Sequence, residues 1–268
     1  MKAFCPFHIT GFFALKRYGA RITSVGCGIV ITDGATTEAF VGDGSVYINR
    51  EPSLAPTSKT VLAALCGTKA DIKTELAGPI SCGLGTSGAG ALSTALSLNE
   101  LWKLNFSFNA LCETAQHAEI INNTGVGDVI AQAVGGVVIR RPHSVDKIPT
   151  QPLKISYLVF GPLSTPEILS DRGALAATEK FGSSALKKLI RRPTFDEFMR
   201  LSRQFAYDTE LLSQKARDAV EAVEASGGCA SMAMLGDAVY GNDPSDALSE
   251  FGIVRKTAIR NCGATLVL

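Results

Sequence analysis

The chain has 268 residues, with 26 Lys and Arg against 25 Asp and Glu, and a formal net charge of +1. Hydrophobic residues make up 46% and charged residues 19%, a composition typical of globular proteins. A near-neutral chain lacks the cationic excess of proteins that bind nucleic acid or anionic lipid, so small molecules are the expected partners. No apolar stretch approaches the roughly 18 residues of a membrane helix. We therefore expect a soluble protein that does not span a membrane.

The seven cysteines are an odd number and include no CxxC pair. This pattern disfavours both a disulfide framework and a zinc knuckle, and it indicates a reducing compartment such as the cytoplasm. The apolar run at the amino terminus is broken by Pro6 and His8, which is not typical of a secretory signal.

The first half of the chain mixes predicted strands and helices. Residues 2–4 are predicted to be extended. They precede an apolar segment, 5–13, which is interrupted by residues that favour turns. Stretches rich in Ile, Val and Thr predict strands, and Asp33-Gly34 and Asp43-Gly44 between them predict hairpins. The predicted strands are 21–32, 37–41, 46–49, 72–81 and 137–140, and the predicted helices are 58–68, 91–103, 109–121 and 128–134.

Three prolines and several charges between residues 141 and 152 predict a linker and a domain boundary near residue 150. The expected domains are therefore 1–150 and 151–268. In the second we expect a strand at 155–160, helices over 171–190, 194–206 and 210–225, and strand-like segments at 254–259 and 264–268. The fold class predicted from these elements is α+β or mixed α/β.

A glycine-rich segment, 83–88 (GLGTSG), precedes a predicted helix. Unhindered N–H groups at a helix amino terminus bind phosphate. The segment formally matches GxGxxG, but Pro79 lies where a dinucleotide fold needs a strand, and the region that follows stays helical. A P-loop is excluded because the segment has no GxxxxGK[ST] and no lysine. The remaining alternative is a turn that only lets the helix pack tightly.

The wider context of this segment resembles the PxxxGLGSSAA signature of the GHMP kinases. Gly127-Asp128 followed by Gly135-Gly136, and the segment 226–231, are similar to two further motifs of that superfamily. The segment 6–13 (PFHITGFF) resembles the archaeal pantoate kinases, as do 24–28, 124–128 and 232–236. Several separated motifs in the correct order cover most of the chain. The signature itself matches Pro79, Gly83, Leu84, Gly85, Thr86, Ser87, Gly88 and Ala89.

The resemblance implies an α+β, two-domain GHMP kinase fold, with an amino-terminal domain like ribosomal protein S5 domain 2 and a ferredoxin-like carboxyl-terminal domain. It implies a cytoplasmic kinase that uses ATP and Mg²⁺ to phosphorylate pantoate to 4-phosphopantoate for coenzyme A biosynthesis. A homodimer is expected. Two alternatives remain: a kinase of the same fold for another small alcohol such as mevalonate or homoserine, or a catalytically silent protein that binds a nucleotide or metabolite.

The resemblance also assigns roles to individual residues. The signature residues would bind ATP, Ser87 and Glu119 would bind Mg²⁺, and Asp128 would be the general base. Glu113 on the same predicted helix is a second candidate for the metal. Simpler readings are that Ser87 and Asp128 are helix N-caps and that the glutamates are solvated.

For the substrate, the candidates are Arg140, Ser24, His117 and Thr165. Arg140 could bind a carboxylate or the transferred phosphoryl group through two hydrogen bonds, so it is also a catalytic candidate. His117 departs from the family pattern, which places a histidine one residue earlier. His8 occupies the position of a lysine in mevalonate kinases, which argues against mevalonate as the substrate.

Overall fold

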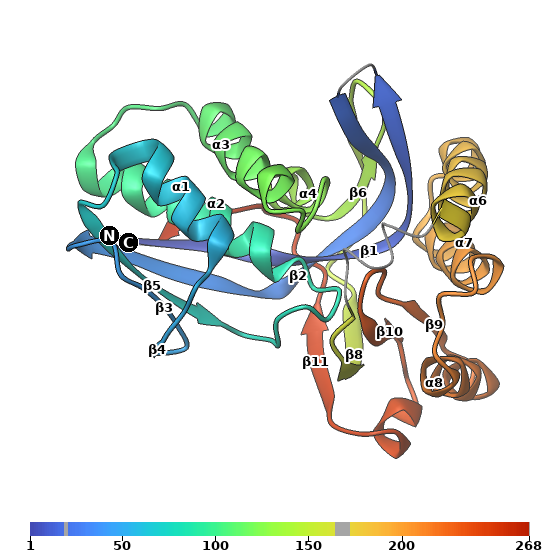
Figure 1. The fold of residues 1–268 in the computed structure, drawn as a ribbon. Helices are drawn as coiled ribbons and strands as arrows, with labels where there is room; N and C mark the ends of the chain where they lie inside the picture. Colours follow the sequence, from blue (N-terminus) through green and yellow to red (C-terminus); the bar gives the residue numbers. More distant parts are fainter. Residues whose placement is uncertain (19–20, 164–171, 268) are drawn as a thin grey trace.

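The computed structural model describes residues 1–18, 21–163 and 172–267, and it contains two β-sheets (Figure 1). The first sheet has eight strands, of which six follow the order β12-β1-β2-β5-β3-β4. β6 pairs with the other part of β2, and β7 pairs with β6. The strands are β1 (Lys2–Tyr18), β2 (Arg21–Val41), β3 (Val46–Ile48), β4 (Glu51–Pro52), β5 (Ala70–Leu76), β6 (Val137–Arg140), β7 (Val145–Ile148) and β12 (Thr265–Val267).

Four helices cover one face of this sheet (Figure 1): α1 (Pro56–Cys66), α2 (Thr86–Trp102), α3 (Phe108–Ile121) and α4 (Asp128–Val134). α2 packs directly on β1 and β2, and α1 and α3 both pack against α2. Ala, Gly, Ser and Leu fill α2 and allow this close packing, and twelve of its residues, from Thr86 to Leu98, are buried. Two of its buried hydroxyl groups bond within the helix, since Ser93 donates to the carbonyl of Ala89 and Thr94 to that of Gly90, whereas Ser97 donates to the carbonyl of Thr37 on β2.

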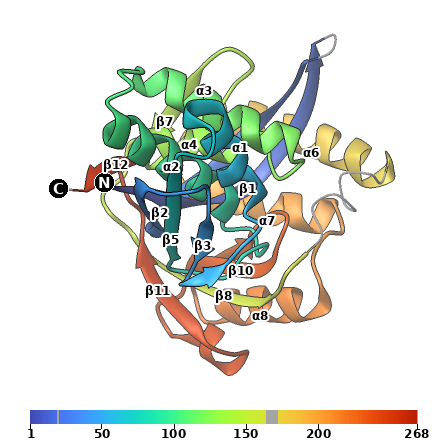
Figure 2. The ribbon, with the colours of Figure 1, turned by 60° about the vertical axis from the view of Figure 1, so that its left-hand side comes forward.

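The second sheet is antiparallel and has the order β11-β8-β10-β9. Its strands are β8 (Lys154–Gly161), β9 (Cys229–Met232), β10 (Asp237–Asn242) and β11 (Val254–Ala258). The other helices in the part of the chain that the structure describes are α6 (Arg172–Arg191), α7 (Phe195–Asp208), α8 (Gln214–Ala225) and the short 3₁₀ helix η1 (Ala247–Glu250). Figure 2 shows the second sheet and α8 below the first sheet, on the side away from α1 and α3.

The two sheets share one hydrophobic core. The ring of Phe12 on β1 lies 6.3 Å from that of Phe198 and 6.4 Å from that of Phe205, both on α7. The same cluster of buried side chains extends from Ile72 on β5 to Tyr240 on β10. The hydroxyl of Tyr157 on β8 donates a hydrogen bond of 2.7 Å to Asp33 on β2, which adds a polar link between the sheets.

The α+β prediction is confirmed, but several predicted boundaries are wrong. β1 runs through Pro6 and Gly11, where irregularities in the β1–β2 register absorb the turn formers. β2 continues through Asp33-Gly34, so the predicted hairpin there does not form. A methyl group at Gly34 would lie 2.4 Å from the carbonyl oxygen of Cys5. Glycine at this position therefore allows β2 to approach β1 closely and does not form a turn.

The predicted linker 141–152 contains β7, and the sequence analysis missed the short strands β9 and β10. The chain passes from the first sheet to the second between β7 and β8, and β12 then returns to the first sheet beside β1. The division into domains 1–150 and 151–268 therefore stays a proposal, with β12 as an extension of the second domain into the first. Among the helices that the structure describes, none combines the length and apolarity needed to cross a bilayer.

Candidate functional site

The glycine loop connects β5 to α2 and lines a cavity of about 470 Å³. Gly83 and Gly85 have φ angles of +77° and +61°, in the left-handed region that favours glycine. Gly85 is the N-cap of α2, and no side chain caps this helix. The alternative that Ser87 is the N-cap is therefore wrong. The first turn of a 17-residue helix thus has backbone N–H groups without intrahelical partners at the wall of the cavity, as an anion site requires.

Five of the signature residues line the cavity and three do not. The lining residues are Gly83, Leu84, Gly85, Thr86 and Ser87. Gly88 and Ala89 are buried, and a methyl group at Gly88 would lie 2.9 Å from Oε1 of Gln132 on α4. Pro79 is exposed and is not part of the cavity wall. Gly88 and Ala89 thus allow close packing of α2, while 83–87 face the space in which a ligand would lie.

Asp128 is the first residue of α4 and lies where this cavity meets a second one. Thr10, Asp128 and Leu235 line both cavities. The N-cap of α4 is Gly127, and no side chain caps the helix, so the alternative that Asp128 is the N-cap is wrong. Instead, Oδ1 of Asp128 lies 2.6 Å from Nδ1 of His8 on β1.

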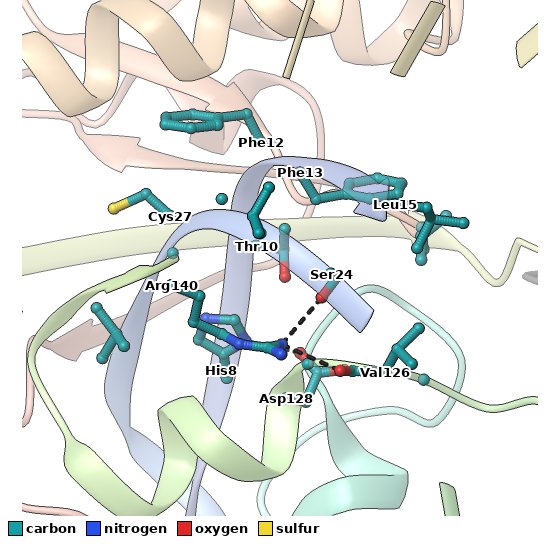
Figure 3. A pocket seen from close by; sticks show the side chains of 17 residues that line it. His8, Thr10, Phe12, Phe13, Leu15, Ser24, Cys27, Val126, Asp128 and Arg140 are labelled. Carbon is teal, nitrogen blue, oxygen red and sulfur yellow. Dashed lines mark hydrogen bonds and ion pairs between the residues drawn. The ribbon is translucent and has the colours of Figure 1, made fainter. Parts of the chain in front are cut away.

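The second cavity, of about 60 Å³, is small and mostly apolar. The polar groups around it are few, and Figure 3 shows Arg140 beside His8, Ser24 and Asp128. Such a pocket suits a small molecule with apolar groups and a few polar atoms. Its apolar side chains include Phe12, Phe13, Leu15, Val25, Val126 and Val138.

Arg140, at the end of β6, is the cationic group of this pocket. Its exposed fraction is 8%, and its Nη1 donates to Ser24 Oγ at 2.9 Å and to the carbonyl of Val126 at 3.1 Å (Figure 3). Burial lowers the pKa of Arg140 to about 10, and the nearby charge of Asp128 opposes this shift, so the guanidinium stays protonated at neutral pH. A methyl group at Gly127 would lie 2.1 Å from Nη1, so Arg140 requires glycine there.

Glu119, near the end of α3, is buried, with an exposed fraction of 1%. The Thr124 hydroxyl donates to its Oε1 at 2.7 Å, while its Oε2 is buried without a hydrogen-bond partner. Burial and then the charge of Asp128 raise the pKa of Glu119 to about 7, and the hydroxyls of Thr124 and Ser87 oppose this shift. Glu113, the other candidate, is exposed.

This arrangement fits a cation that takes oxygen ligands. A buried carboxyl group with one free oxygen beside the Ser87 hydroxyl offers the hard oxygen atoms that Mg²⁺ prefers. Within residues 1–18, 21–163 and 172–267, no three His, Cys, Asp or Glu side chains gather as a metal site. Glu119 and Ser87 are thus the residues of this site that could hold such an ion.

Comparison with known proteins agrees with this geometry. The family GHMP kinases N terminal domain matches residues 55–136, which include the glycine loop and α4. The chain is 32% identical to a pantoate kinase from Methanocaldococcus jannaschii, over 96% of this chain and 97% of that protein. It is also 32% identical to a pantoate kinase from Methanospirillum hungatei, over 99% of this chain and 96% of that protein. The chain belongs to the pantoate kinase family of GHMP kinases.

A solved structure described as a phosphotransferase related to the CoA biosynthesis pathway has the same fold. Its TM-score is 0.87 at 24% identity, and the match covers 99% of this chain and 98% of the other. The predicted membership of the GHMP kinases is thus confirmed, and so is the α+β fold of a GHMP kinase.

The structure of this GHMP kinase brings together most of the predicted site residues. Besides Pro79, Gly88 and Ala89, which do not line the cavity, two others are not placed in the site. His117 is exposed and lines neither of the two cavities, so its predicted role in substrate binding has no support from this geometry. Thr165 lies outside the described residues. The sequence did not single out Thr10 and Leu235, which line both cavities, or Gln132, whose side chain contacts Gly85. Their only signal was a position inside or beside a recognised motif.

Proposed function

We propose that the protein transfers the γ-phosphate of ATP to a hydroxyl group of pantoate and forms 4-phosphopantoate for coenzyme A biosynthesis. The observation that carries this proposal is the position of Asp128, which lines both the large cavity beside the glycine loop and the small cavity with Arg140. A phosphoryl donor in one cavity and an acceptor in the other would meet at this carboxylate. The similarity to pantoate kinases supports the choice of acceptor.

The two cavities would divide the ligands by their chemistry. The triphosphate of ATP would lie along Gly83 to Ser87 at the start of α2, where the helix dipole favours negative charge. Pantoate is a branched hydroxy acid with a carboxylate and two methyl groups on one carbon. Its carboxylate would bind Arg140 and Ser24, and its methyl groups would contact the apolar wall that includes Phe12 and Val138.

In the reaction, the hydroxyl oxygen of pantoate forms a bond to the γ-phosphorus while the bond from that phosphorus to the bridging oxygen of ADP breaks. Asp128 accepts the hydroxyl proton, and Arg140 holds the acceptor in place. Mg²⁺, held by Ser87 and Glu119 together with the nucleotide, would neutralise phosphate charge. The backbone N–H groups at the start of α2 would stabilise the charge on the phosphates.

The first test is Mg²⁺-dependent release of ADP from ATP with pantoate, pantothenate, mevalonate and homoserine in separate assays. Turnover with pantoate, lost in Asp128→Asn while ATP still binds, would support both the substrate and the base. Turnover with another alcohol would keep the kinase and contradict pantoate. No turnover with any of them would favour the alternative of a silent binding protein.

We also propose that the protein acts in the cytoplasm as a homodimer. The absence of any paired cysteine pattern in the sequence supports a reducing compartment. Sedimentation of the purified protein measures the oligomeric state directly, and a monomer at micromolar concentration would contradict the dimer.

A further inference from the structure

His8 contacts both the base and the phosphate loop of the proposed site. It lies on β1 with an exposed fraction of 5%, and its Nδ1 is 2.6 Å from Oδ1 of Asp128. We infer that His8 is a positioning residue for proton transfer: it holds one carboxylate oxygen of Asp128 so that the other oxygen is directed to the acceptor. This inference rests on the proposed role of Asp128 as the base.

The backbone of His8 is fixed to the glycine loop. Its N–H donates to the carbonyl oxygen of Leu84 at 3.2 Å, and a methyl group at Gly85 would lie 3.2 Å from the carbonyl oxygen of His8. The main chain of one residue therefore contacts the loop that would hold the phosphates, while its side chain contacts the base. His8 thus fixes the distance between the two groups that the transfer must bring together.

The neighbouring strand, β2, also restricts the position of the His8 imidazole. A methyl group at Gly28 on β2 would lie 2.3 Å from Nε2 of His8, so only glycine leaves room for this ring. A ring packed in this way has little freedom to rotate away from Asp128. The ring of His8 and the carbonyl oxygen of Ile9, which would lie 2.5 Å from the same methyl group, together explain the glycine at position 28.

The chemistry of the contact defines the tautomer. A carboxylate only accepts hydrogen bonds, so Nδ1 of His8 carries the proton that it shares with Oδ1. The other oxygen, Oδ2, lies on the side of Gly125, which lines the small cavity: a methyl group at Gly125 would be 3.3 Å from it. Oδ2 is therefore the oxygen that would accept the proton of the substrate hydroxyl.

The kinetic test compares His8→Asn with His8→Leu. The amide nitrogen of asparagine can occupy the place of Nδ1, whereas leucine fills the space without a donor. His8→Leu should lower kcat about 10- to 100-fold, the usual effect of losing a hydrogen bond to a charged group. KM for ATP should stay within about 2-fold, because the contact with the loop uses the backbone. His8→Asn should recover most of the lost kcat.

A purely structural role would give a different result. His8→Asn and His8→Leu would then lower the thermal midpoint and kcat to the same extent, and this would overturn the inference. His143→Leu, at an exposed histidine, is the control and should leave kcat unchanged.

A second measurement does not depend on the identity of the substrate. The nitrogen-15 spectrum of histidine in the wild-type protein should show His8 as the Nδ1–H tautomer, and Asp128→Ala should shift that resonance. A neutral Nε2–H tautomer, or a resonance that does not respond to Asp128→Ala, would overturn the inference even if pantoate is not the acceptor. Failure of pantoate turnover alone contradicts only the proposed function.

Discussion

The side-chain amide of Gln132 donates a hydrogen bond of 2.8 Å from Nε2 to the carbonyl oxygen of Gly85. Gln132 is fully buried on α4, one helical turn after Asp128. Because Gly85 is the N-cap of α2, this bond joins the start of the helix that would bind phosphate to the helix that carries Asp128, the proposed base. This hydrogen bond therefore adds a polar contact to the direct packing of α2 on α4.

Replacing Gln132 with Leu should weaken ATP binding. The change removes the side-chain donor to Gly85, whose carbonyl oxygen then keeps only the 3.0 Å bond from the N–H of Ala89, while the amide Oε1 has no hydrogen bond to lose. We expect KM for ATP to rise about 10-fold, with a smaller effect on KM for the acceptor. Steady-state kinetics with each substrate varied in turn measures the difference. Equal KM for ATP in Gln132→Leu and the wild type would show that the contact does not hold the loop.

The variant Asp128→Asn distinguishes a role of Asp128 in catalysis from a role in stabilising α4. If Asp128 is the base, kcat should fall about 10²- to 10⁴-fold, while the free energy of unfolding changes little. A residue that only stabilised the start of α4 would show the reverse, a loss of about 1 kcal/mol in stability with kcat preserved. Denaturant unfolding and turnover measured on the same preparation distinguish the two outcomes.

Local sequence signals predicted the elements around Asp128 well. α4 and β6 lie at the predicted residues because glycines bound them: Gly127 precedes α4, and Gly135-Gly136, both with positive φ, separate it from β6. The long strands were harder to predict. Asp33-Gly34 carries a strong hairpin signal, but pairing of β2 with β1 and β5 on both sides keeps this segment extended.

The site was predictable as a set of motifs but not as a set of contacts. The motifs identified the loop, Glu119, Asp128 and Arg140, which the structure brings together. The contact between His8 and Asp128 joins residues 120 positions apart, and no local pattern encodes such a pairing. His117 shows the opposite case. It lies two residues before Glu119 in the sequence, but on α3 its side chain is exposed whereas that of Glu119 is buried.

Glu119 should make the stability of the metal-free protein depend on pH. Its pKa is raised to about 7 in the folded state, above its ordinary value, so the folded protein binds a proton more tightly than the unfolded chain. The contribution of Glu119 to stability is therefore most favourable in acid and falls as pH rises from about 4.5 to about 7, by roughly 3 kcal/mol at most. Unfolding in EDTA at pH 5 and pH 8 measures this loss.

Glu119→Gln should remove most of that pH dependence, since a neutral amide has no charge to bury. Glu113→Gln, at an exposed position of the same helix, is the matched control and should retain it. If the two variants show the same pH dependence as the wild type, the carboxyl group of Glu119 is not the source. Turnover should fall strongly in Glu119→Gln and remain in Glu113→Gln, because the proposed Mg²⁺ ion is held by the buried Glu119 with Ser87 and not by the exposed Glu113.

Arg140→Lys should impair binding of the acceptor more than binding of ATP. Lysine keeps the positive charge but lacks the planar group whose Nη1 donates to both Ser24 and Val126, so the charge would no longer be held in place. We expect KM for pantoate to rise about 10- to 100-fold, with KM for ATP nearly unchanged. Arg141→Lys is the control, because Arg141 points to Asp146 at the surface and lines neither cavity. A rise in KM for ATP alone would instead assign Arg140 to the transferred phosphoryl group.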